Sequence, residues 1–492
     1  GSIYDGHRFF ARGERAVIRV SNLDASMLYA ETPEMQMHTM GVLILEPDGE
    51  SGGAPDPSDP LERVRQLIMD RVHLIPPFRR RIVQGPLQIG DPHWIEDPDF
   101  DLDKHLKYVS LPSPGGMPQL CDLVGEIAGA CLPRDRPLWS ATLVEGLEGG
   151  KFAFIMKVHH AAMDGGRSAA IAGELMDTSP EGRVIPPPEE PWVPDRAPTI
   201  PWLAADTLRT LAGKPRRAVE AASKVASGLR AKGQPRTEEL EQDDAPAKAP
   251  LFEAPPTPFN GALTPNRSVG LTDVSFDDVK AIKRAFGTTV NDVVLAACTG
   301  SLRSWLQAHG GLPERPLVAT VPVSVRNDGD QDGNRVSVIR VHLPIQCDDP
   351  VERLMALNEE TTRQKKRHKS GGGGDVLKNV ADLITNITIP WIATHLVGLY
   401  SSSHLADRVP PLWNLIISNI AGPQVPLYTT GLRLRQLYPL GPVQQGSGLN
   451  ITVMSTVDRL CFGLLTCTEL VPDVQSIASG VESEIDALKA LA

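Results

Sequence analysis

The chain has 492 residues, of which 60 are acidic and 49 basic, and its net charge is −11 at pH 7. Because a single hydrophobic core stops growing near about 250–300 residues, this length predicts two domains of comparable size. An apolar fraction of 41% excludes a disordered chain, and the acidic balance argues against nucleic acid as the main partner, since phosphate binding requires a basic face.

The cysteines and the N-terminus indicate a cytoplasmic protein. The six cysteines have neither CxxC spacing nor the density of a secreted, disulfide-stapled domain. The N-terminus lacks the basic-then-apolar order of a signal peptide, and Gly1-Ser2 resembles an expression remnant. We therefore expect a reducing compartment and no secretion.

The first predicted elements are a short helix, a strand and a longer helix. Asp24 can cap the short helix, which runs to Ala30. Residues 38–46 are predicted to form a strand, and apolar residues at helical spacing predict a helix over 61–74. The prolines and glycines of residues 47–60 indicate a loop between these two elements.

A predicted strand pair then leads to two adjacent histidines. A helix over about residues 119–131 precedes strands at 142–145 and 151–158. Gly149-Gly150 lies between the strands and predicts a tight antiparallel turn. The second strand ends at His159-His160.

Residues 180–265 differ in composition from both flanks. Prolines gather at both ends, and a basic, alanine-rich stretch over 206–236 predicts one helix within a linker. Trp192 and Trp202 precede this stretch. Basic residues beside tryptophans can hold a helix against an anionic membrane or lipid droplet, whereas the alternative is an ordinary solvated helix.

The second half alternates helices with strands. Helices are predicted over 275–286 and 288–309. The β-branched runs that predict strands are residues 317–325, 336–343, 415–418 and 449–456. The basic run 365–369, followed by four glycines, is typical of a mobile surface loop.

One segment of the second half contains no charged residue and is long enough to span a membrane. Residues 383–404 contain no Asp, Glu, Lys or Arg. Their Asn, Thr, Ser and Pro content is nevertheless too high for a spanning helix. This composition indicates a helix that is buried or lies at a membrane interface.

The strongest chemical signal is the segment from His159-His160 to Asp164-Gly165. Successive side chains of an extended segment point to opposite faces, so only one histidine can reach a given substrate atom. With an unperturbed pKa of about 6.5, a histidine is largely neutral in the cell and can take a proton from an attacking alcohol. Asp164 can accept backbone N–H groups or pair with an arginine, and Gly165 permits a close turn.

Three other interpretations compete with a general base. Both histidines could satisfy hydrogen bonds in a core, as such residues often do. A metal site is disfavoured because the two histidines face opposite ways and no further ligand cluster follows. A serine hydrolase is disfavoured because Ser168 lacks a complete nucleophile elbow, and the absence of an assignable nucleophile favours direct transfer over an acyl-enzyme.

Residues 159–165 match the HHxxxDG motif of the acyltransferase superfamily that includes chloramphenicol acetyltransferase and peptide-synthetase condensation domains. Further segments resemble the wax ester synthase/diacylglycerol acyltransferase family in particular. These segments are residues 23–26, 28–29, 37–38, 136–139, 291–296, 321–326, 418–423 and 448–451. They occur in the family's order over nearly the whole chain, although Ile420-Ala421 depart from the family's usual SNVPGP.

The resemblance implies an α/β fold of two chloramphenicol-acetyltransferase-like domains, each a mixed sheet with helices, that face each other across a substrate tunnel. The domains would cover residues 1–179 and 266–492, with the linker at 180–265. It also implies an acyl-CoA-dependent O-acyltransferase that acts on diacylglycerol, a long-chain alcohol or both. Acyl-CoA would be a co-substrate, with no permanently bound cofactor and no metal.

The resemblance also assigns roles within the HHxxxDG motif. His160 would be the general base. His159, Asp164 and Gly165 would support it structurally.

In the second half, the resemblance places substrate-binding residues at Asn291, Asp292 and Asn419. Asn291 would contact the substrate or the oxyanion, and the alternative is that it only caps a helix. Asp292 would cap a helix or form an ion pair.

Two other functions remain open at this point. A related condensation enzyme would use acyl groups bound to a carrier protein, and a non-catalytic protein would bind lipid droplets through the basic linker. For the acyltransferase, we expect peripheral association with a membrane or lipid droplet, and a homodimer is compatible with the sequence.

Overall fold

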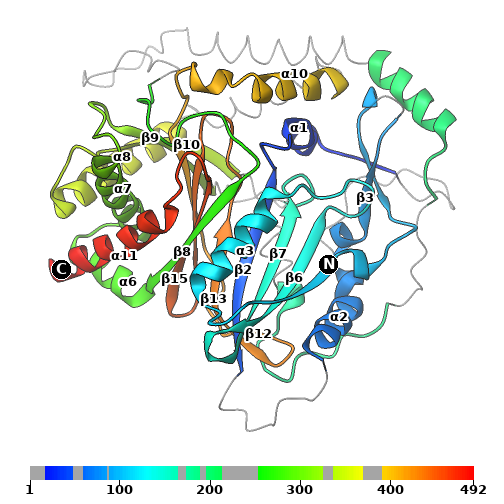
Figure 1. Cartoon of the computed structure of the whole chain (residues 1–492), viewed down its shortest axis with the longest axis horizontal. Helices are drawn as coiled ribbons and strands as arrows, with labels where there is room; N and C mark the ends of the chain where they lie inside the picture. The colour runs from blue at the N-terminus through cyan, green and yellow to red at the C-terminus, as the bar shows by residue number, and fades with distance from the viewer. Residues whose placement is uncertain are drawn as a thin grey trace.

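The computed structural model describes residues 17–47, 59–85, 88–163, 173–188, 196–212, 253–324, 336–369 and 390–492. Two six-stranded sheets dominate the molecule, and helices pack against both (Figure 1). The fold is therefore mixed α/β with two sheet-rich halves, as expected. Asp164, Gly165, most of the predicted 206–236 helix and the four glycines after residue 370 lie outside the described residues.

The first sheet has the strand order β12-β13-β2-β7-β6-β5. Its strands from the first half are β2 (His38–Pro47), β5 (Leu106–Ser110), β6 (Trp139–Leu147) and β7 (Lys151–His159). The β6–β7 hairpin turns at Gly149 and Gly150, whose φ values of 76° and 70° favour glycine. Both predicted strands of this hairpin are confirmed, and β6 is longer than expected.

Two strands of this sheet come from the far end of the chain. They are β12 (Tyr428–Thr429) and β13 (Leu432–Leu440), and β13 pairs antiparallel with β2. Neither strand was predicted from the sequence. The two halves therefore share a sheet, in addition to packing against each other.

The helices of the first half are α1 (Asn22–Ala30), α2 (Pro60–Arg71) and α3 (Met117–Gly129). The prediction that Asp24 caps α1 was wrong, because the hydroxyl of Ser21 accepts the Asp24 N–H at 3.1 Å and Asp24 lies in the first turn. Helix α3 lies against β8 (Arg267–Ser275) of the second half. A Cβ atom on Gly125 would lie 2.5 Å from the Arg267 carbonyl oxygen, so the absence of a side chain permits this contact.

The second sheet has the strand order β10-β9-β11-β14-β15-β8. Its strands are β8 (Arg267–Ser275), β9 (Leu317–Ser324), β10 (Val336–Leu343), β11 (Leu415–Ile420), β14 (Leu449–Ser455) and β15 (Arg459–Cys467). Strand β11 runs parallel to both β9 and β14, and the other pairs are antiparallel. The sheet is thus mixed, and four of its strands match the predicted runs.

In the described part of the chain, the helices that pack against this sheet are α6 (Phe276–Ala285), α7 (Val290–Ala308), α8 (Pro350–Lys369) and α11 (Val474–Ala490). The first two match the predicted helices within two residues. The prediction of a loop at 365–369 was wrong, because these residues form the last turns of α8. Cationic side chains at the C-terminal end of a helix interact favourably with its dipole, which accounts for a basic run in that place.

Smaller elements complete the described residues. Strands β1 (Ile18–Arg19), β3 (Arg80–Val83) and β4 (His93–Glu96) form a three-stranded sheet. Short 3-10 helices are η1 (Val72–Leu74), η2 (Pro76–Phe78), η4 (Leu102–Lys104), η5 (Glu148–Gly150) and η6 (Leu405–Asp407).

Two further helices lie along the upper edge of Figure 1: α10 (Pro390–Ser402) and the helix at residues 200–212. The predicted uncharged helix is thus present as α10. Among the described residues, no helix combines the length and apolarity needed to cross a membrane.

Strand β13 of the first sheet crosses β15 of the second sheet at close range, and this close approach of the two backbones can be tested. A Cβ atom on Gly463 would lie 2.0 Å from the Pro439 carbonyl oxygen. We expect Gly463→Ala to lower the free energy of unfolding by about 2 kcal/mol or more, because backbone must move to relieve the overlap. Chemical denaturation measures this loss. Gly398→Ala is the control, since nothing lies within 4 Å of its Cβ position, and an equal loss there would contradict the crossing.

Candidate active site

Strand β7 ends at the histidine pair and separates its two side chains. His159 is completely buried, whereas His160 is partly exposed. The N–H of His159 donates to the Leu138 carbonyl at 3.0 Å, and that of His160 donates to the Met37 carbonyl at 2.8 Å. The backbone is therefore fixed on both sides while the two rings face different surroundings, as the strand periodicity predicts.

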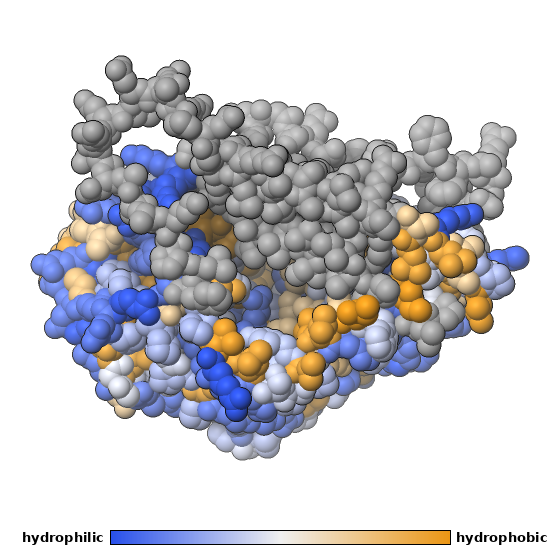
Figure 2. Space-filling model, turned by 90° about the horizontal axis from the view of Figure 1, so that it is seen from above, coloured by the Kyte–Doolittle hydropathy of each residue, from blue (hydrophilic) through white to orange (hydrophobic). Residues whose placement is uncertain are grey.

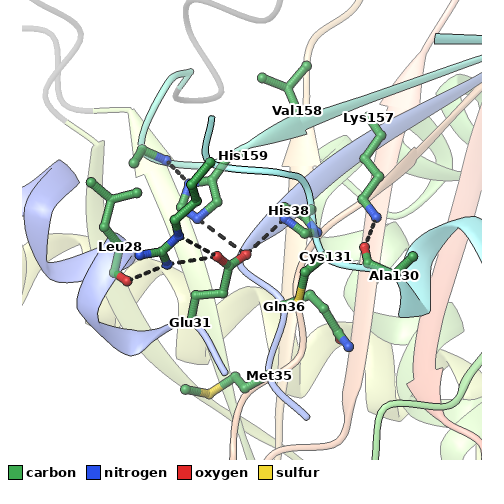
Figure 3. A network of polar contacts seen from close by, with 12 residues as sticks. Leu28, Glu31, Met35, Gln36, His38, Ala130, Cys131, Lys157, Val158 and His159 are labelled. Atoms are coloured by element: carbon green, nitrogen blue, oxygen red, sulfur yellow. Dashed lines mark hydrogen bonds and ion pairs between the residues drawn. The ribbon is translucent and has the colours of Figure 1, made fainter. Parts of the chain in front are cut away.

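The His159 ring is held from two directions. Its Nδ1 accepts the N–H of Ala161 at 3.0 Å, and its Nε2 lies 3.5 Å from Glu31 Oε1. A ring nitrogen that accepts a hydrogen bond carries no proton, so a neutral His159 has its proton on Nε2. That N–H faces the Glu31 carboxylate (Figure 3).

Glu31 is the centre of this network, and the sequence analysis did not identify it. It follows α1 directly and is 9% exposed. Its Oε1 lies 2.9 Å from His38 Nε2, and its Oε2 accepts two hydrogen bonds from Arg134, from Nη2 at 2.8 Å and from Nε at 3.2 Å. Burial alone raises the pKa of Glu31, but its contacts with His159 and His38 outweigh burial and hold the pKa well below its usual range.

His38 faces the same carboxylate from the start of β2. It is paired with His159 across the two strands, and the two rings meet edge to face with centroids 5.4 Å apart. Burial lowers the pKa of His38 to about 4, against the opposing effect of Glu31. His38 is therefore neutral at cellular pH, and the Glu31 carboxylate faces this neutral imidazole, the His159 ring and one guanidinium.

Lys157 extends the polar row along β7, two residues before His159. Its Nζ donates to the carbonyls of Ile127, at 2.6 Å, and Ala130, at the end of α3. Burial lowers the pKa of Lys157 to about 8. The side chain thus ties the last part of β7 to the end of α3.

Glu31, His38 and His159 are also the residues that could hold a metal ion, since each offers a ligand atom within 4.8 Å of the others. The hydrogen bond from Ala161 disfavours this use. A metal on His159 Nε2 needs the ring proton on Nδ1, where the Ala161 N–H already donates. Arg134 also occupies the second oxygen of Glu31, and a cation nearby opposes a second positive charge.

Asn291 and Asp292 lie in the first turn of α7, in the second half. The Asp292 side chain is completely buried and accepts hydrogen bonds from Thr289, Asn358 and Thr361, with donor distances of 2.7–2.9 Å. Thr289 and Asp292 form a reciprocal capping box, which matches the expected capping role. Asn291, the residue before Asp292, is partly exposed.

Asn419 lies near the end of β11, opposite Val453 of β14, and is partly exposed. Neither Asn419 nor Asn291 belongs to the polar network around His159. The structure therefore brings His159 together with Glu31 and His38, with His160 next to His159 in the chain, and it places the other described site residues on the second half.

Comparison with known protein families shows to which family the chain belongs. A family model of the wax ester synthase/diacylglycerol acyltransferase catalytic domain matches residues 20–294. The chain belongs to the wax ester synthase/diacylglycerol acyltransferase family. The model of the family's C-terminal domain matches residues 332–489. As a member of this family, the chain is an O-acyltransferase.

Individual relatives cover nearly the whole chain. A Mycobacterium tuberculosis protein that carries the name of a diacylglycerol O-acyltransferase is 35% identical over 477 residues, which is 95% of this chain and 89% of that protein. The O-acyltransferase WSD of Acinetobacter baylyi is 30% identical and covers 94% of this chain and 95% of its own length. These relatives support the assignment to wax ester synthases and diacylglycerol acyltransferases.

Solved structures agree with this family assignment. The wax ester synthase/diacylglycerol acyltransferase of Marinobacter aquaeolei VT8 superimposes with a TM-score of 0.66 at 27% identity, over 96% of this chain and 99% of that one. The first condensation domain of the calcium-dependent antibiotic synthetase has a TM-score of 0.54 at 14% identity, over 97% of this chain and 96% of that one. The second likeness concerns the fold alone.

The capping role of Asp292 can be measured separately from catalysis. Asp292→Ala removes the cap of α7 and the carboxylate that accepts hydrogen bonds from the partly buried Asn358 and the buried Thr361. We expect the free energy of unfolding to fall by about 2–4 kcal/mol. Thermal or chemical denaturation measures the loss. Asp277→Ala in the first turn of α6 is the matched control, because its carboxylate is exposed and only an effect below about 0.5 kcal/mol is expected.

Proposed function

We propose that this O-acyltransferase moves a fatty acyl group from acyl-CoA to the hydroxyl of diacylglycerol, of a long-chain alcohol, or of both, and that His160 is the general base. The observation that carries the proposal is the contrast at the end of β7. His159 is buried and held through both ring nitrogens, whereas its neighbour His160 keeps a partly exposed ring.

The reaction would proceed without a covalent intermediate. His160 takes the proton of the acceptor hydroxyl while that oxygen attacks the thioester carbonyl, which becomes a tetrahedral oxyanion. The carbon–sulfur bond then breaks, and the protonated His160 returns the proton to the leaving CoA thiolate. The products are the ester and CoA, and the histidine is restored to its neutral form.

The oxyanion requires a hydrogen-bond donor, which contributes about 2.7–4 kcal/mol in comparable enzymes. Asn291 supports this role because its amide is partly exposed at the start of a helix that the Asp292 capping box fixes. A backbone N–H is the other donor we consider. Substrate binding by Asn419, and supporting roles for Asp164 and Gly165, remain predictions by motif position.

His160→Ala tests the assignment directly. We expect the variant to fold with the stability of the wild type, because the side chain is not buried, and to lose at least about 100-fold in ester formation. The assay offers labelled palmitoyl-CoA together with diacylglycerol and hexadecanol, and the ratio of triacylglycerol to wax ester reports the preferred acceptor. Wild-type turnover in this variant would defeat the proposal.

The same assay separates the neighbouring histidine and the rival substrate. His159→Ala should lower stability and activity together, since it leaves the buried Glu31 carboxylate without one of its partners. An acylated carrier protein in place of acyl-CoA should give no ester. Transfer from the carrier protein alone would instead favour a condensation enzyme.

We also propose that the enzyme acts at a membrane or lipid-droplet surface through α10. Trp391, Leu396 and Leu399 are 47%, 57% and 66% exposed and project from a helix that contains no Asp, Glu, Lys or Arg. On the helix at residues 200–212, Ile200 and Leu208 are 70% and 68% exposed. Figure 2 looks down on this face and shows apolar side chains gathered along it, as expected for an interfacial contact.

Vesicle flotation tests the surface contact. We expect the double variant Leu396→Asp/Leu399→Asp to lose most of the binding to vesicles of phosphatidylcholine and phosphatidylglycerol, because a charge replaces each apolar contact. Val184→Asp is the control. Val184 is 95% exposed, but it lies on neither of these two helices and follows Asp177, whose backbone pairs with Tyr428 of β12. Equal flotation of the double variant and the wild type would rule out this face.

A further inference from the structure

A short turn links the His159 ring to the backbone that carries His160. The Ala161 N–H that donates to His159 Nδ1 lies one residue beyond His160, and the Ala162 N–H donates to the His159 carbonyl at 2.9 Å. His160 therefore lies within a turn that is held by a backbone hydrogen bond and by the ring of its neighbour His159. Rotation of the His159 ring would break the bond to Ala161, which is one of the two hydrogen bonds within this turn, and would loosen the turn on the side of Ala161.

The ring is prevented from rotating by the carboxylate on its other side. Glu31 Oε1, His38 Nε2 and His159 Nε2 are buried, and within the described parts of the chain none of them makes an aligned hydrogen bond. The negative charge of Glu31 is thus what compensates both ring N–H groups, at 2.9 and 3.5 Å. Without that charge, His159 has no partner on this side and can turn toward another acceptor.

Glu31 itself is fixed from outside the histidine pair. Arg134 donates to Glu31 Oε2 and also to the Leu28 carbonyl at 2.8 Å. The guanidinium thus holds the carboxylate against the last turn of α1, in the geometry that Figure 3 shows. The chain of contacts runs from α1 through Glu31 and His159 to the turn at His160.

From these contacts we infer that Glu31 is the positioning residue for the catalytic base. Its carboxylate orients His159 and thereby sets the place of His160 without touching substrate. This inference rests on the proposed function, because it matters for catalysis only if His160 is the base. A misplacement of about 1 Å at a reacting group lowers turnover by about 100-fold, so a small turn of His159 is sufficient.

The decisive variant is Glu31→Gln, which keeps the size of the side chain and removes its charge. We expect kcat for ester formation to fall about 10- to 100-fold while KM for palmitoyl-CoA stays within about twofold, because the base is displaced and the binding surface is not. Glu31→Asp keeps the charge and should recover part of kcat. A residue that only stabilises the fold would lower the amount of active enzyme without this pattern.

The second half provides a matched control. Glu360 on α8 is also buried and also faces a histidine, with its Oε1 2.9 Å from His342 Nδ1. Glu360→Gln thus removes the same charge from the same kind of pair, far from β7 in the sequence. We expect its kcat per folded molecule to equal that of the wild type, with the folded fraction measured by circular dichroism.

The outcomes distinguish this inference from the proposed function. Loss of activity in His160→Ala together with wild-type kcat in folded Glu31→Gln would overturn the inference and leave the proposed function standing. Wild-type activity in His160→Ala would remove both. If Glu31→Gln does not fold, Arg134→Gln and Glu31→Asp replace it, and full kcat in both folded variants would equally overturn the inference.

Discussion

The structure depends on β2, which is hydrogen-bonded on one side to β7 and on the other to β13. The first pairing sets His38 opposite His159, and the second brings a strand from the end of the chain into the first sheet. Because the register of a strand fixes which face each side chain occupies, a shift of one residue would move His159 out of its buried position. The same strand thus joins the two halves and places the histidine pair.

The contacts of Glu31 also give a reason why a buried carboxylate is retained beside the histidine pair. Isolated burial of a carboxylate is costly, and even a well-paired buried ion pair adds little net stability over apolar packing. Glu31 contacts two histidines and Arg134, and one of these histidines, His159, directly precedes the proposed base. A defined orientation of the ring can matter for catalysis there even if it adds nothing to stability. The arrangement resembles the carboxylate–histidine pairs that set a ring tautomer in other enzymes, although here the oriented ring is the neighbour of the base.

Local patterns were sufficient for much of this fold. The limits of β10, and those of β2 and α7 within one or two residues, follow from β-branched runs and from the Thr289 cap. Strand β13 was missed because its partner β2 lies almost four hundred residues away, and no local pattern reports such a pairing. Glu31 was missed for the same reason, since its partners His38, Arg134 and His159 meet only in the folded chain. His160 could be proposed as the base because the HHxxxDG motif is a local signal.

The buried end of α10 connects the proposed lipid surface to this same region. Ser401 is 2% exposed, and its hydroxyl contacts Thr32 at 3.3 Å and accepts a hydrogen bond from Gln445 at 2.6 Å. Thr32 directly follows Glu31, so the helix with exposed apolar side chains is anchored one residue from the carboxylate that faces His159. An apolar acceptor gains nothing by leaving a lipid surface for water. An anchored connection between the proposed lipid surface and the region of the proposed base therefore suits an enzyme whose acceptor is a lipid alcohol.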